Sequence, residues 1–97
     1  MTKPSRALII LKQLLDEGIN DDDSLYIVYW ASGKKTYPIQ FYKNIDHLRK
    51  RFRSAFVEKL PRAIIIRGRF VALAVLKLAR AFNLNPKIYR LEEVREE

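Results

Sequence analysis

The sequence predicts an α+β fold, a two-layer sandwich in which a four-stranded mixed sheet packs with three helices in the order αββαβαβ. Two observations lead to this expectation. Segments with helical apolar spacing alternate with short runs of β-branched and aromatic residues, and turn-forming residues separate them. The length of 97 residues is close to the commonest domain size, so we expect residues 1–97 to form a single domain.

The N-terminal part is expected to form a helix and a β-hairpin. Apolar residues follow Pro4-Ser5 at helical spacing, and Gly18 is placed to end that helix. Residues 25–30 are aromatic and β-branched, which predicts a strand. Residues 31–35 form the hairpin loop, and residues 36–42 return as a second strand.

Two further helices and two further strands are expected in the remainder. Asn44 is predicted to cap a helix whose apolar residues keep the helical period as far as Leu60. Residues 62–67 form a short strand with an apolar middle, which is typical of burial on both faces. The third helix covers residues 68–83, and residues 87–94 form the last strand.

The helix predicted over residues 68–83 is unusually apolar. Its charged residues Arg69, Lys77 and Arg80 share one narrow stripe. A helix that covers one face of a sheet needs an apolar stripe only ~100° wide. The surplus has to pack either against another helix of the chain or against a second copy of it. The second possibility predicts a homodimer.

Positive charge is concentrated in the middle of the chain. The formal net charge is +8, from 19 Lys or Arg against 11 Asp or Glu. Residues 24–91 hold fifteen of these cations and only Asp46 and Glu58 as acids, a net of +13. Repulsion among these cations opposes folding and gives the domain no stability. Their concentration therefore indicates a polyanionic partner, most commonly nucleic acid. We therefore predict binding of DNA or RNA through the phosphate backbone with little sequence preference.

The stretch Ile64-Ile65-Ile66-Arg67-Gly68-Arg69 is a candidate anion site. A strand-to-helix turn presents backbone N–H groups and the positive end of the helix dipole. Gly68 permits a positive φ, and the two arginines offer planar forks suited to phosphate. Alternatively, Gly68 only reverses the chain and the arginines point into solvent.

The same stretch carries a resemblance to a known family. Together with Phe70-Val71-Ala72-Leu73-Ala74-Val75 and Asn85-Pro86-Lys87-Ile88, it resembles the Alba family of archaeal chromatin proteins, over residues ~37–94. The resemblance implies a dimer that binds DNA and RNA, with Lys43, Arg67 and Arg69 contacting the nucleic-acid backbone. Leu73 stands where that family has a lysine, and residues 1–36 have no counterpart. In this resemblance, Lys34 and Lys35 of the predicted hairpin loop would take the place of the basic hairpin arm that members of the family use.

The predicted nucleic-acid-binding residues are the cations of these segments and the junction glycine: Lys34, Lys35, Lys43, Arg49, Arg53, Arg67, Gly68, Arg69, Lys77 and Arg80. Aromatic residues also crowd the predicted hairpin, where rings could stack on the bases of a single strand. The interpretation favoured for most of them is burial in the core or in a dimer interface. These rings belong to Tyr26, Tyr29, Trp30, Tyr37, Phe41 and Tyr42.

Other classes of protein are less well supported by the sequence. We expect no enzyme, cofactor, metal or small-molecule substrate, because the one histidine has no acid partner and neither a phosphate loop nor a nucleophile elbow occurs. A small ribonuclease toxin using His47, Arg49, Arg67 and Tyr89 is one alternative. A viral or plasmid-type inhibitor that binds an acidic protein is another. Without a signal peptide or an apolar span, and with many Ile, Arg, Lys and Glu, the chain is expected to be cytoplasmic and thermophilic, archaeal or viral.

Overall fold

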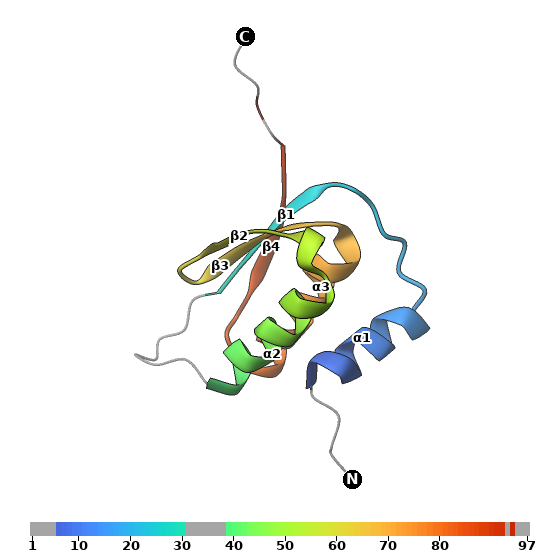
Figure 1. Cartoon of the computed structure of the whole chain (residues 1–97), viewed down its shortest axis with the longest axis vertical. Helices are drawn as coiled ribbons and strands as arrows, with labels where there is room; N and C mark the ends of the chain where they lie inside the picture. The colour runs from blue at the N-terminus through green and yellow to red at the C-terminus, as the bar shows by residue number, and fades with distance from the viewer. Residues whose placement is uncertain (1–5, 31–38, 93, 95–97) are drawn as a thin grey trace.

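The structure is a computed structural model, and it describes residues 6–30, 39–92 and 94. The elements in these ranges are α1 (Arg6–Asp16), β1 (Leu25–Tyr29), α2 (Ile39–Arg51), the short 3-10 helix η1 (Arg53–Ala55), β2 (Phe56–Leu60), β3 (Ala63–Arg67), α3 (Arg69–Ala81) and β4 (Lys87–Leu91). One layer of helices packs on one four-stranded sheet (Figure 1). The predicted α+β class is therefore confirmed.

The sheet has the strand order β2-β3-β1-β4, and every neighbouring pair is antiparallel. The predicted order αββαβαβ indicates a mixed sheet. In the structure β3 and β4 run in the same direction. The prediction of a mixed sheet is wrong because β1 lies between these two strands and pairs antiparallel with both.

Two predicted elements in the middle of the chain are also wrong. The strand expected over residues 36–42 is helical from Ile39, and residues 36–38 lie outside the described part, as does the expected hairpin loop. The helix expected to reach Leu60 ends at Arg51, and residues 56–60 form β2. Pro61 thus belongs to the turn of the β2–β3 hairpin. The order over the described residues becomes αβαββαβ, with η1 before β2.

Asn44 is not the cap of α2 but a buried residue within it. Its side-chain oxygen accepts a hydrogen bond from the Ala7 backbone N–H in the first turn of α1, at 2.9 Å. Its side-chain nitrogen donates to the Gln40 carbonyl at 2.7 Å. Because the first backbone N–H groups of a helix have no partner within it, Asn44 supplies one to α1 and ties α2 to that helix.

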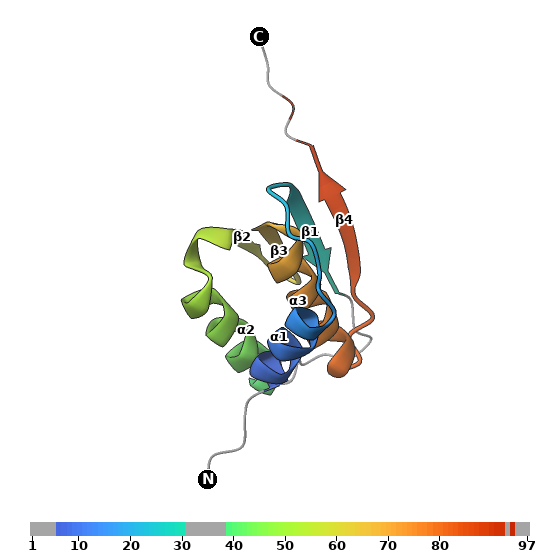
Figure 2. The ribbon, with the colours of Figure 1, turned by 90° about the vertical axis from the view of Figure 1, so that its right-hand side faces the viewer.

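The helices α1, α2 and α3 all lie on one side of the sheet (Figure 2). α3 packs directly against the strands, and α1 and α2 lie across it. This arrangement buries the surplus apolar surface of α3. Of the two predicted alternatives, packing against other helices of the chain is therefore the one observed. The buried residues of α3 are Val71, Ala72, Ala74, Val75, Leu76, Leu78 and Ala79.

The opposite face of the sheet has an apolar centre bordered by Glu58, Arg67 and Lys87, and no helix within the described residues covers it. Successive side chains of a strand point to opposite faces of the sheet, and residues paired directly across neighbouring strands point to the same face. On β1, β3 and β4, the residues that alternate with those facing the helices therefore point to this uncovered face. Tyr29 and Tyr89 stack here, with ring centroids 5.9 Å apart. We call this surface the open sheet face, and its apolar residues are Leu25, Ile27, Tyr29, Ile65, Tyr89 and Leu91.

Candidate nucleic-acid interface

The junction of β3 and α3 has the predicted turn geometry, but its backbone donors are already bonded. Gly68 has a φ of 103°, a conformation that favours glycine. The N–H groups of Arg69 and Phe70 donate to the carboxylates of Asp22 and Asp21, each at 3.0 Å. The protein's own carboxylates therefore occupy the site where a phosphate was expected. We call Asp21, Asp22, Arg67, Gly68 and Arg69 the capped corner.

Further contacts hold the capped corner together. The Gly68 N–H donates to the Ser24 carbonyl at 2.8 Å, and an Arg67 guanidinium nitrogen donates to the Asp23 carbonyl at 3.0 Å. The Tyr26 hydroxyl donates to Asp22 and is the main cause of the lowered pKa of that carboxyl, which the Ser24 and Arg69 backbone bonds and the Arg69 charge lower further. The acidic segment before β1 thus fixes and partly neutralises this corner.

A second basic region lies between α2 and the β2–β3 hairpin, where three hollows adjoin. The first, of about 380 Å³, is lined by Arg49, Lys50, Arg53 and Phe56. The second, of about 180 Å³, shares Arg49 and Phe56 with the first. The third, of about 400 Å³, shares Lys59 with the second. We call this continuous surface the basic groove, and its cations are Arg49, Lys50, Arg53, Lys59 and Arg62.

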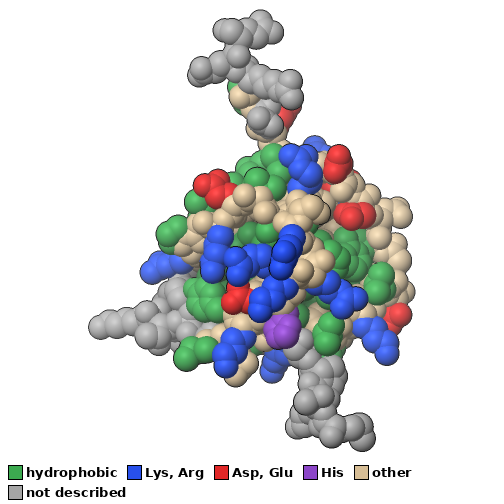
Figure 3. Space-filling view, viewed as in Figure 1, with side chains coloured by type: hydrophobic (Ala, Val, Ile, Leu, Met, Phe, Trp, Pro, Cys, Tyr) green, Lys and Arg blue, Asp and Glu red, His purple; other side chains and the backbone are tan. Residues whose placement is uncertain are grey.

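The basic groove has little acidic compensation. Asp46 lines the second hollow and pairs with Arg49 at 3.1 Å, with both side chains about half exposed. Glu58 also lines that hollow, but it stands opposite Ile65 in the sheet, on the side of the open sheet face. Figure 3 shows Lys and Arg side chains gathered over α2 and the hairpin, with few acids between them. The local field is therefore positive.

The predicted binding residues do not share one surface. Arg49 and Arg53 lie in the basic groove, and Lys43 is exposed on α2. Lys77 on α3 pairs with Glu17 at 3.0 Å, while Arg80 lines a separate hollow with Lys87. Arg67, Gly68 and Arg69 belong to the capped corner, and Lys34 and Lys35 lie outside the described residues.

Sequence reasoning missed Lys50, Lys59 and Arg62 as parts of the interface. Lys59 was assigned to a helix, whereas it stands on β2 opposite Ile64, whose side chain is buried beneath the helices. Arg62 occupies the hairpin turn with a φ of 64°. The available signal was the Pro61-Arg62 pair between two apolar runs, which is compatible with a hairpin turn.

The structure does not assemble the alternative ribonuclease residues. His47 and Arg49 lie on α2, whereas Arg67 and Tyr89 belong to strand positions that face away from the helices. Across the part of the chain that the structure describes, no cluster of acidic or histidine side chains could hold a metal ion. No helix there is long and apolar enough to cross a membrane.

No protein-family model, curated protein or solved structure matches this chain. The resemblance to the Alba family therefore stays a prediction. Its later part, from Ile64 onward, has the expected order of strand, helix and strand. Its earlier part differs, because the segment expected as the first strand is helical from Ile39.

Proposed function

We propose that this protein binds DNA or RNA through the phosphate backbone, with the basic groove as the interface. The observation that supports this most directly is the group of five cations that line three adjoining hollows between α2 and the β2–β3 hairpin, against Asp46 and Glu58 as the acids there. Lys and Arg contacts to phosphate carry no sequence information in themselves. Binding is therefore expected to be strong at low salt and nearly independent of base sequence.

Salt dependence tests this proposal. The logarithm of the binding constant should fall with the logarithm of salt concentration by roughly 0.9 for each duplex phosphate neutralised. Replacing Arg49 and Arg53 together with alanine should make the slope shallower by roughly 2 and weaken binding. The matched control is the double exchange of Arg67 and Arg69 to alanine, which removes the same charge from the capped corner.

The control is expected to change the slope by less than the groove variant does. Equal losses in both double variants would contradict the groove as the interface. Absence of binding to any labelled oligonucleotide at low ionic strength would overturn the function itself and leave an acidic protein as the alternative partner.

The open sheet face supports a homodimer as part of this proposal. Its centre is formed by Ile27, Ile65 and the stacked pair Tyr29 and Tyr89. A second copy would bring the same apolar side chains, so both faces would leave water when two sheets pack about 10 Å apart. Light scattering after size exclusion should give twice the chain mass, and Ile65→Glu should reduce it to one. A wild-type monomer at high concentration would refute the dimer.

A further inference from the structure

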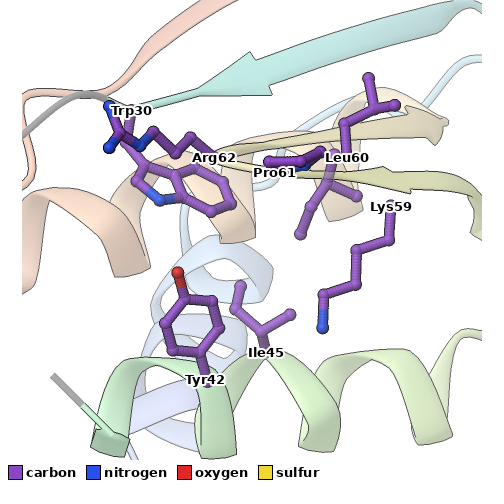
Figure 4. A pocket seen from close by; sticks show the side chains of 8 residues that line it. Trp30, Tyr42, Ile45, Lys59, Leu60, Pro61 and Arg62 are labelled. Carbon is purple, nitrogen blue, oxygen red and sulfur yellow. The ribbon is translucent and has the colours of Figure 1, made fainter. Parts of the chain in front are cut away.

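The hollow at the hairpin end of the basic groove differs from the other two, because two aromatic rings line it, whereas the others have only the ring of Phe56. Trp30 follows β1 and Tyr42 belongs to α2, and the two rings enclose the hollow together with Ile45 (Figure 4). Ile64 also lines it. The turn of the β2–β3 hairpin closes a third side. Its volume of about 400 Å³ is within the range of small-molecule binding pockets. We call it the Trp30 pocket.

Trp30, which lines the pocket, has a buried hydrogen-bond donor that has no partner. Trp30 is 2% exposed, and its indole nitrogen is the one buried side-chain nitrogen or oxygen without a hydrogen bond among the described residues. In Figure 4 this nitrogen lies on the side of the ring that faces Tyr42 across the pocket. A donor left unpaired in the interior costs free energy, and folded proteins retain few of them.

The chemistry of the pocket restricts what it can bind. The indole N–H donates only, so the ligand has to provide an acceptor. Two aromatic walls favour a flat ring. The exposed cations Lys59 and Arg62 line the same pocket, and the Lys59 ammonium lies 5.8 Å from the centroid of the Tyr42 ring. A planar ring with acceptor atoms next to a negative charge describes a nucleobase attached to its phosphate.

The position of the pocket agrees with this occupant. Lys59 lines both the Trp30 pocket and the adjoining hollow, which in turn shares Arg49 with the hollow at the end of α2. A strand whose phosphates follow the groove cations would bring a base to the pocket. Bases in a duplex are paired and stacked, so only a single strand or an extruded base can enter such a site.

We propose that the Trp30 pocket binds one unstacked base of single-stranded DNA or RNA, with the indole N–H donating to an acceptor on that base. This inference rests on the proposed function and adds a preference for single strands to it. Tyr42, which is partly buried and faces the indole, provides the ring on which the base stacks.

The wild-type protein tests this directly, because Trp30 is the only tryptophan in the chain. An end-labelled single-stranded oligothymidine and a duplex of the same length are titrated at one low salt concentration. Anisotropy of the label follows binding, and tryptophan fluorescence follows the pocket. We expect the single strand to quench Trp30 and the duplex to bind without quenching it.

A pair of variants separates stacking from charge. Tyr42→Ala should weaken binding of the single strand by about fivefold or more and leave duplex binding unchanged, since stacking on one ring contributes this much per base. Arg53→Ala removes a groove cation outside the pocket and should weaken both ligands by a similar factor. Melting curves verify that both variants fold.

Each outcome decides the inference. Quenching confined to the single strand, together with a selective loss in Tyr42→Ala, supports it. Binding of both ligands with no change in Trp30 fluorescence overturns the base pocket and leaves the proposed phosphate-binding function intact. Absence of binding to either ligand overturns both, and quenching by the two ligands alike overturns the single-strand preference.

Discussion

The capped corner and the basic groove contain the same type of side chain but use it differently. At the corner, carboxylates from the segment before β1 accept hydrogen bonds from the backbone N–H groups at the start of α3. In the groove, the cations come from α2, η1 and the hairpin, and Asp46 forms an ion pair with Arg49 there. Charge at the corner is therefore held in contacts within the fold, whereas the groove is the region where we propose that positive charge meets a ligand.

The largest predicted effect is a difference in stability between two variants, one at Gly68 in the capped corner and one at Arg62 in the turn of the basic groove. At Gly68 the φ is 103° and an added Cβ would lie 3.3 Å from an Asp21 carboxylate oxygen. Gly68→Ala should therefore lower the free energy of unfolding by about 1–3 kcal/mol. Urea denaturation measures the loss.

Arg62→Gly is the matched exchange in the groove, where the φ is 64°. Relief of the left-handed strain and the added flexibility of glycine oppose each other, so stability should change by less than about 1 kcal/mol. Nucleic-acid affinity should fall because a groove cation is lost. A large stability loss in Arg62→Gly, or none in Gly68→Ala, would contradict the division between the two regions.

The next largest effect is expected at Asn44, which fixes the helix that forms one wall of the groove. Asn44→Ala removes the acceptor of the buried Ala7 N–H and should cost about 1–3 kcal/mol of unfolding free energy. Gln13→Ala, at an exposed amide on α1, is the control and should change stability by less than about 0.5 kcal/mol. Equal urea midpoints for the two variants would show that the buried contact is not required.

The smallest effect concerns pH at the corner. The hydrogen bond from Tyr26 holds the pKa of Asp22 below its ordinary value of 3.8. A carboxyl with a lowered folded pKa stabilises the fold above its unfolded pKa, and this contribution is lost as the pH falls through the folded value. The melting temperature should therefore fall on acidification below about pH 4. Tyr26→Phe should flatten that fall, and parallel curves for the two proteins would contradict it.

Most of the fold follows from local sequence patterns. The predictions of β1, β3, α3 and β4 place each element within a few residues of its observed bounds, because turn residues interrupt clear apolar runs. Residues 56–60 were misassigned because Phe52, Phe56 and Leu60 also fit a helical period. β2 is an edge strand with an irregular register at Phe56–Glu58, and only its pairing with β3 defines it.

The candidate site was less predictable than the fold. Arg49 and Arg53 were among the cations predicted to bind nucleic acid, but their position beside Lys59 and Arg62 could be found only once the hairpin was known. The capped corner shows the opposite case. Nothing in the spacing of Asp21 and Asp22 along the sequence indicates that their carboxylates cap a helix beginning at Arg69.

The sequence by itself determined the excess of positive charge, the glycine turn at residue 68 and the apolar periodicity of α3, because each depends on neighbouring residues alone. The tertiary structure decided which cations lie near one another, which carboxylates bond the backbone at the start of α3, and where Trp30 comes to lie. Those outcomes depend on strand pairing and helix packing between residues more than forty positions apart, such as Asp22 and Arg69. Contacts over such separations are fixed only when the whole core forms, and local patterns do not encode them.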